Sequence, residues 1–146
     1  MPTAREIALC DALVAELNAQ PALVEGLVAE RMLVPYYDRT TNVVAMAVSP
    51  DRTNRTSRSR GDDEVAYTVA IWLWQPVASQ ADEHVEPAVN VAAAVFAYWD
   101  RGGPLFDARL AGMNPESVEF FPVAEDDLVD EDLVTSLLLV TYSEVR

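Results

Sequence analysis

The chain has 146 residues, 51% of them hydrophobic, and a net charge of −14 that sets 24 acidic residues against ten arginines. This length suits one domain with a sizeable core, and the hydrophobic content argues against disorder throughout. Strong acidity disfavours nonspecific adhesion to DNA or to anionic lipid. No run reaches the roughly 20 apolar residues of a membrane span, and the N-terminus lacks the pattern of a secretory signal. We therefore expect one soluble domain, residues 1–146, made in the cytoplasm.

The first predicted element is a helix over residues 3–19. Apolar residues recur there at three- and four-residue spacing, which is typical of one buried helical face. Four of them mark that face: Ile7, Cys10, Val14 and Leu17. Thr3 and Glu6 have the spacing of a capping box, and Pro21 ends the helix. Cys10, the single cysteine, has no internal disulfide partner, and we interpret it as a small buried hydrophobe.

Three strands are expected in the next part of the chain. Residues 27–36 are interpreted as a strand, with Leu27, Ala29, Arg31 and Leu33 on one face and Pro35 at an edge or strand end. Residues 43–48 are an apolar run, and residues 65–75 alternate over eleven positions with apolar groups on both faces. A strand that is apolar on both faces is typical of the centre of a sheet, covered on each side. We expect the strand of residues 65–75 to be central and mostly buried.

A long polar segment, residues 49–64, joins the last two of these strands. It exceeds the length of a tight turn, and we interpret it as a loop that forms a projecting arm. The arm holds four of the ten positive charges: Arg52, Arg55, Arg58 and Arg60. Spaced arginines can bind phosphates, although the arm has no aromatic residue for base stacking. Three interpretations stay open: contact with an acidic protein surface, a plain flexible loop, or nucleic-acid binding.

The second half of the chain predicts one helix and two strands. A polar lead-in over residues 79–86 precedes Pro87, which fits a first helical turn. An apolar helix then runs to about Asp100, and Gly102-Gly103-Pro104 stops it. A short strand over residues 118–123 and a long one over residues 133–145 follow. Together these elements predict an α+β fold: a mostly antiparallel sheet of about four strands with two packed helices.

Few residues are candidates for chemistry. The densest cluster is an expected acidic loop, with Glu125, Asp126, Asp127, Asp130, Glu131 and Asp132. Clustered carboxylates can hold hard cations, but the glycine and the distal Glu of a calcium loop are missing, so we favour a solvated or partner-facing loop. His84 is the only histidine and lies among acidic residues, which favours a surface position. No nucleophile motif, phosphate-binding loop or paired cysteine is present, and we expect no catalytic residue, metal or cofactor.

In its organisation the chain resembles the tail-completion, or tail-terminator, proteins of long-tailed bacteriophages. The resemblance covers most of the chain and depends on the order of elements more than on strict motifs. It rests on the opening helix, Leu33-Val34-Pro35, an arm ending in Ser59-Arg60-Gly61-Asp62, the strand of residues 65–74, a covering helix to Trp99, and the closing strand of residues 137–142.

The resemblance implies a structural virion protein of the tail and neck. Such proteins are small α+β domains that form a ring, commonly a hexamer, at the head-proximal end of the tail tube. They bind the last ring of the tube protein and a head–tail connector protein, DNA passes through them without specific binding, and no catalytic residue transfers. Two other classes remain as alternatives: a small metal-dependent enzyme using residues 125–132, and a monomeric acidic binding or immunity module.

Two further expectations concern the arm. We expect residues 49–61 to project from the core and to order against another chain. We also expect the four arm arginines to reach carboxylates of the next subunit, with residues 125–132 as candidates. Trp72, Trp74 and Trp99 are expected in the core, where they would also suit a buried subunit contact.

Overall fold

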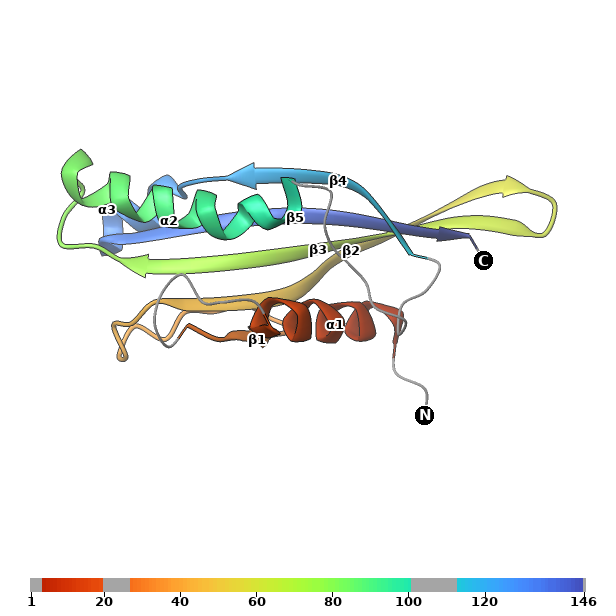
Figure 1. Ribbon diagram of the computed structural model, residues 1–146, viewed down its shortest axis with the longest axis horizontal. Helices are drawn as coiled ribbons and strands as arrows, with labels where there is room; N and C mark the ends of the chain where they lie inside the picture. The colour runs from red at the N-terminus through yellow and green to blue at the C-terminus, as the bar shows by residue number, and fades with distance from the viewer. Residues whose placement is uncertain (1–3, 20–26, 101–112, 146) are drawn as a thin grey trace.

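The computed structural model describes residues 4–19, 27–100 and 113–145, apart from the side chains of residues 98–100, 114 and 115. It contains three helices and one five-stranded sheet (Figure 1). In chain order these elements are α1 (Arg5–Ala19), β1 (Ala29–Arg31), β2 (Ala45–Ser59), β3 (Asp62–Pro76), α2 (Asp82–Asp100), β4 (Asn114–Phe121), α3 (Glu125–Glu131) and β5 (Leu133–Val145). The predicted α+β class is confirmed: the sheet is mostly antiparallel but has five strands where about four were expected, and there are three helices where two were expected.

The strand order is β1-β2-β3-β5-β4, so β3 is central as predicted. β1 runs parallel to β2, and every other neighbouring pair is antiparallel. The side chains of β3 that face the helices are almost fully buried: Val65, Tyr67, Val69, Ile71 and Leu73. β5 is as long as predicted and pairs with β3 from Glu64–Val145 to Pro76–Leu133. This long β3–β5 ladder lies at the centre of the core.

Both long helices cover the same face of the sheet. Leu9 and Leu13 of α1 join one hydrophobic cluster with Phe96 of α2 and the inward side chains of β3. α1 contacts β1, β2 and β3, whereas α2 contacts β5, and Figure 1 shows the two helices lying along different parts of the sheet. The ring of Phe96 also meets Phe120 of β4 edge-on at 5.3 Å. The main core therefore lies between one face of the sheet and the two long helices.

A smaller cluster lies on the opposite face, at one end of the sheet. Trp72 stacks on Trp74 with ring centroids 6.0 Å apart, and Tyr37 packs on Trp74 at 5.9 Å. The segment that follows β1 supplies Tyr37, and Leu133 at the start of β5 completes the cluster. Trp74 is buried as predicted, Trp72 is half-buried, and the Trp99 side chain lies outside the described part of the chain.

Several predicted boundaries are wrong. The strand expected over residues 27–36 is only Ala29–Arg31, because the chain leaves the sheet after the Met32 amide donates to the Val48 carbonyl. α2 begins at Asp82, so residues 82–86 of the expected lead-in are helical and Pro87 lies inside the helix, beyond its first turn. Acidic side chains at the positive end of the helix dipole favour that earlier start. β4 spans Asn114–Phe121 where residues 118–123 were expected.

The signals expected at Thr3, at Pro21 and at Gly102-Gly103-Pro104 lie outside the described residues. Glu6, the other half of the predicted capping box, accepts a hydrogen bond from the Thr53 hydroxyl at 2.9 Å. This contact links the first turn of α1 to the base of the polar arm.

Candidate interaction site

The expected polar loop is instead a β-hairpin that extends the sheet. β2 continues to Ser59 and β3 begins at Asp62, and the two strands pair from Ala45–Trp74 to Ser59–Asp62, with register shifts at residues 51 and 58. Gly61, with φ +96°, occupies the turn between them, a conformation that favours glycine. The sequence pattern did not predict this strand, because residues 51–61 are exposed on both faces and have no apolar alternation. Backbone pairing with β3 makes the segment a strand.

We call residues 51–61 the arm. Every residue of the arm is exposed, and Figure 1 shows the hairpin extending beyond the helices at the end away from α3. The prediction that residues 49–61 project from the core is confirmed for the arm, whereas Ser49 itself is buried. Whether the arm orders against another chain remains a prediction.

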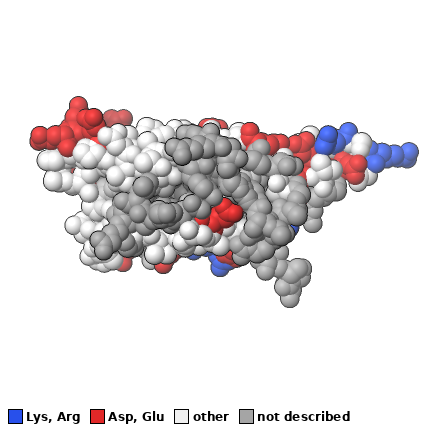
Figure 2. All heavy atoms as spheres, in the orientation of Figure 1, with Lys and Arg blue, Asp and Glu red and all other residues white. Residues whose placement is uncertain are grey.

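The arm arginines lie beside carboxylates of the same hairpin. Three ion pairs join the hairpin's own charges: Arg52–Asp51 at 3.8 Å, Arg55–Asp63 at 3.5 Å and Arg58–Glu64 at 3.9 Å. Exposed pairs of this length contribute at most about 1 kcal/mol. Arg60 makes no ion pair within the described part of the chain. Figure 2 shows basic side chains gathered at the hairpin tip, so the end of the arm is locally positive on a strongly acidic protein.

The expected acidic loop is a short helix, α3, at the other end of the sheet (Figure 1). Acidic residues in its first turn suit the helix dipole, and Asp132 ends it in a left-handed conformation, φ 51°. Asp127 accepts a hydrogen bond from the Thr135 hydroxyl at 2.6 Å, and Glu131 pairs with Arg39. Glu125, Asp126, Asp130 and Asp132 are exposed. Within one chain, α3 and the arm therefore do not meet, and the expected contact between them would have to join two copies.

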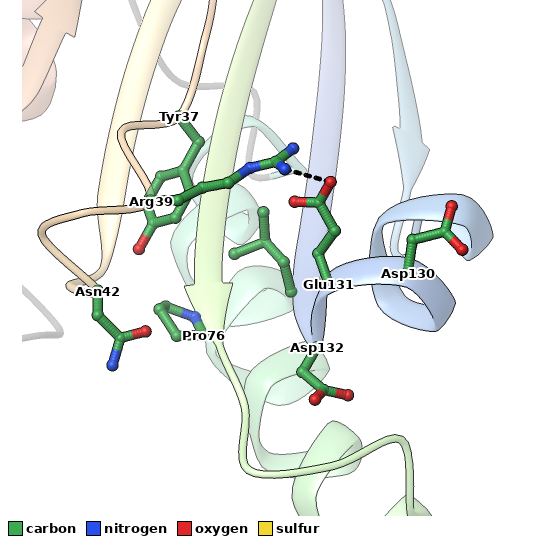
Figure 3. A pocket seen from close by; sticks show the side chains of 8 residues that line it. Tyr37, Arg39, Asn42, Pro76, Asp130, Glu131 and Asp132 are labelled. Carbon is green, nitrogen blue, oxygen red and sulfur yellow. Dashed lines mark ion pairs between the residues drawn. The ribbon is translucent and has the colours of Figure 1, made fainter.

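A pocket of about 350 Å³ lies beside α3 (Figure 3). Its lining comes from the segment after β1, the end of β3 and the α3–β5 junction: Tyr37, Arg39, Asn42, Pro76, Asp130, Glu131, Asp132 and Leu133. Arg39 lies against Glu131, whereas Asp130 and Asp132 point elsewhere. One carboxylate oxygen of Glu131 is buried without a hydrogen-bond partner. In the described ranges no three His, Cys, Asp or Glu side chains are placed to hold a metal ion together.

The two lone reactive residues lie where the sequence predicted them. Cys10 is fully buried in α1, and burial raises the pKa of its thiol to about 12. The thiol therefore stays protonated and inert at neutral pH. His84 is exposed; its Nδ1 atom lies 2.7 Å from the hydroxyl of Ser79, which precedes α2, and its Nε2 atom lies 3.9 Å from Glu83.

A buried ionic network was not predicted. Glu144 of β5 is 8% exposed and accepts hydrogen bonds from Arg5 of α1 at 2.6 Å and from the Tyr67 hydroxyl at 2.7 Å. The hydrogen bond with Glu144 raises the pKa of Arg5. The alternation of β5 could have predicted that Glu144 is buried, since Glu144 lies on the same strand face as the buried residues Leu138, Val140 and Tyr142. This network fastens the start of α1 to the end of β5.

The sequence did not predict that the outer edge of β4 is an exposed candidate interaction surface. It is the last strand of the sheet, and on its outer side no described strand pairs with it. Three large apolar side chains of β4 are exposed: Val118 by 39%, Phe120 by 38% and Phe121 by 46%. Glu116 and Glu119 of the same strand are exposed as well. An open, partly apolar edge strand is a place where another chain can add a strand.

Comparison with protein-family models finds no match for this chain, and comparison with curated proteins finds none either. Among the described helices, none combines the length and apolar character that crossing a membrane requires.

Proposed function

We propose that this protein is a structural virion protein of the tail-terminator kind. Copies of it form a ring at the head-proximal end of a bacteriophage tail tube and join the tail to the head connector. In most proteins of that kind the ring is a hexamer. The observation that carries the proposal is the hairpin arm, exposed along its whole length and extended away from the core. A two-stranded extension buries little surface of its own and is marginally stable by itself. Contact with a second protein would bury part of the arm and stabilise it.

The order of elements gives a second line of support. An opening helix, a polar arm followed by a long strand, a covering helix and a closing strand are among the features on which the resemblance to tail terminators rests. The domain has each of them: α1, the β2–β3 hairpin, α2 and β5. The outer edge of the arm and the outer edge of β4 have no described strand partner, and they remain for protein contacts.

The charge of the chain fits a neck through which DNA passes. A ring of subunits with net charge −14 presents carboxylates that repel the duplex and keep it from adhering to the wall. A basic wall would bind phosphates and slow their passage. In this proposal the positive arm tip binds protein and not DNA: either the next subunit or the tube and connector proteins.

The proposal is tested by the mass of the purified protein in solution. We expect light scattering and native mass spectrometry to show one closed multiple of the 16.1 kDa chain across a concentration series, and negative-stain images to show rings. Added divalent metal should leave the melting temperature unchanged. A monomer at every concentration contradicts the proposal, and strong stabilisation by a divalent ion would favour the metal-dependent alternative.

A further inference from the structure

We propose that the arm of one copy pairs, strand to strand, with β4 of the next copy. The outer edge of β2 over residues 51–59 and the outer edge of β4 would form one antiparallel ladder between subunits. This inference rests on the proposed function, because it names the contact that would build the ring.

Both edges are open over similar lengths. β1 covers the outer side of β2 only from Met46 to Val48, so beyond that point no described strand pairs with β2 on this side. β4 offers eight residues at the opposite margin of the sheet. An unpaired edge presents backbone amides and carbonyls that a strand of another chain can satisfy. Because the two edges lie on opposite sides of the sheet, each copy can use both at once.

Strand direction favours this pairing. Within the sheet β2 and β5 run one way and β3 and β4 the other, since each of these neighbouring pairs is antiparallel. A second copy placed beside β2 in the same orientation therefore brings its β4 antiparallel to the arm, which is the more stable kind of ladder. A contact between two different surfaces repeats head to tail, and it closes into a ring when the rotation between copies permits.

Charge and side-chain direction indicate a register. Arg52 pairs with Thr68, and Glu119 pairs with Leu139, positions that share the sheet face turned away from α1 and α2. Placing Arg52 opposite Glu119 gives an ion pair between subunits. The same antiparallel register places Asn54 opposite Ser117, and both residues also belong to that face.

β4 is a better partner for the arm than α3. The carboxylates of α3 include Asp127 and Glu131, which already bond to Thr135 and Arg39. A short helix also offers no free strand edge, whereas β4 supplies both carboxylates and an open backbone edge. Its exposed Phe121 lies at the end of β4 that would meet the base of the arm, where contact would remove apolar surface from water.

Site-directed cross-linking tests the register. The double variant Asn54→Cys, Ser117→Cys leaves Arg52 and Glu119 intact, and the native Cys10 is fully buried and should not react. With a short bismaleimide we expect a ladder of covalent multimers that ends at the ring number, whereas each single variant stays monomeric in denaturing gels. The matched control, Asn54→Cys with Asp126→Cys on α3, should yield no ladder.

A charge swap tests the ion pair separately. At low salt we expect Arg52→Glu and Glu119→Arg each to weaken assembly several-fold, and the double swap to restore it. Rings without the 54–117 ladder, or a ladder only with Asp126, would overturn this inference and leave the proposed function standing. A parent protein that remains monomeric overturns both.

Discussion

At the scale of single residues, the Arg5–Glu144–Tyr67 network is the feature with the clearest energetic consequence. A carboxylate that is almost buried loses its hydration, and its hydrogen bonds and its cationic partner must compensate for that loss. Arg5 keeps part of its side chain exposed, 32%, so solvent screens the pair to some degree. The pair is therefore only partly desolvated, and removing one of its partners should cost more than breaking an exposed pair.

We predict that Arg5→Ala lowers the free energy of unfolding by about 2 kcal/mol, because it removes the Arg5 cation from a largely buried carboxylate. Tyr67→Phe removes the hydroxyl that donates to Glu144 and should cost about 1 kcal/mol. The matched control is Arg31→Ala on the exposed Arg31–Asp11 pair at 3.0 Å, for which we expect less than about 1 kcal/mol. Chemical denaturation followed by circular dichroism measures all three. Equal losses in Arg5→Ala and Arg31→Ala would contradict a special role for the buried network.

At the scale of elements, the hairpin divides into a buried base and an exposed arm. Val48 and Ser49 of β2 and Val65 of β3 belong to the buried part, whereas residues 51–61 are exposed. The domain therefore gains little hydrophobic stabilisation from the arm. Ordering the arm costs backbone conformational entropy. Strand pairing within the hairpin, and contact with another protein, would offset that cost.

Shortening the arm tests this division. We predict that replacing residues 56–64 with Asn-Gly, a turn suited to a two-residue hairpin, joins the paired residues Arg55 and Val65 through that turn and preserves the folded domain. The free energy of unfolding should change by no more than about 1 kcal/mol, while ring formation is weakened or lost. Thermal melting and light scattering measure the two effects. Loss of the folded monomer would show that the arm belongs to the core after all.

At the scale of the whole molecule, charge is distributed unevenly along the long axis. Basic side chains gather at the hairpin tip, and α3 places its carboxylates at the other end of the sheet (Figures 1 and 2). Copies that each carry a net charge of −14 repel one another, so every contact between them needs local compensation. The arm arginines are the positive charges best placed to supply it.

We predict that changing Arg52, Arg55, Arg58 and Arg60 to serine leaves a folded protein that assembles poorly at low salt. The variant loses four positive charges, so its net charge falls from −14 to −18. High salt should partly restore assembly, because it screens the remaining repulsion. The matched Arg-to-Lys variant keeps the charge and should assemble nearly as the parent does. Light scattering over a salt series decides, and a serine variant that assembles like the parent at every salt concentration would refute this role.

The sequence predicted the parts of the fold that depend on local periodicity. α1 and β5 have strict apolar patterns, and their observed bounds lie within a few residues of the predicted ones. The two-sided apolar pattern of β3 also indicated its central place in the sheet. At the candidate site, the sequence indicated the projecting arginine arm and the acidic cluster, but neither of their backbone conformations.

By itself, then, the sequence determined the central strand, the two covering helices and the polar arm, because apolar spacing acts within each element. Only the tertiary structure showed that the arm is a strand, since its pairing with β3 joins backbone groups whatever their side chains. The same holds for the short parallel β1 and for the open edge of β4, because strand order depends on contacts between distant residues. Burial of Glu144 likewise required α1 and β5 to meet, which brings together residues 139 positions apart in the chain.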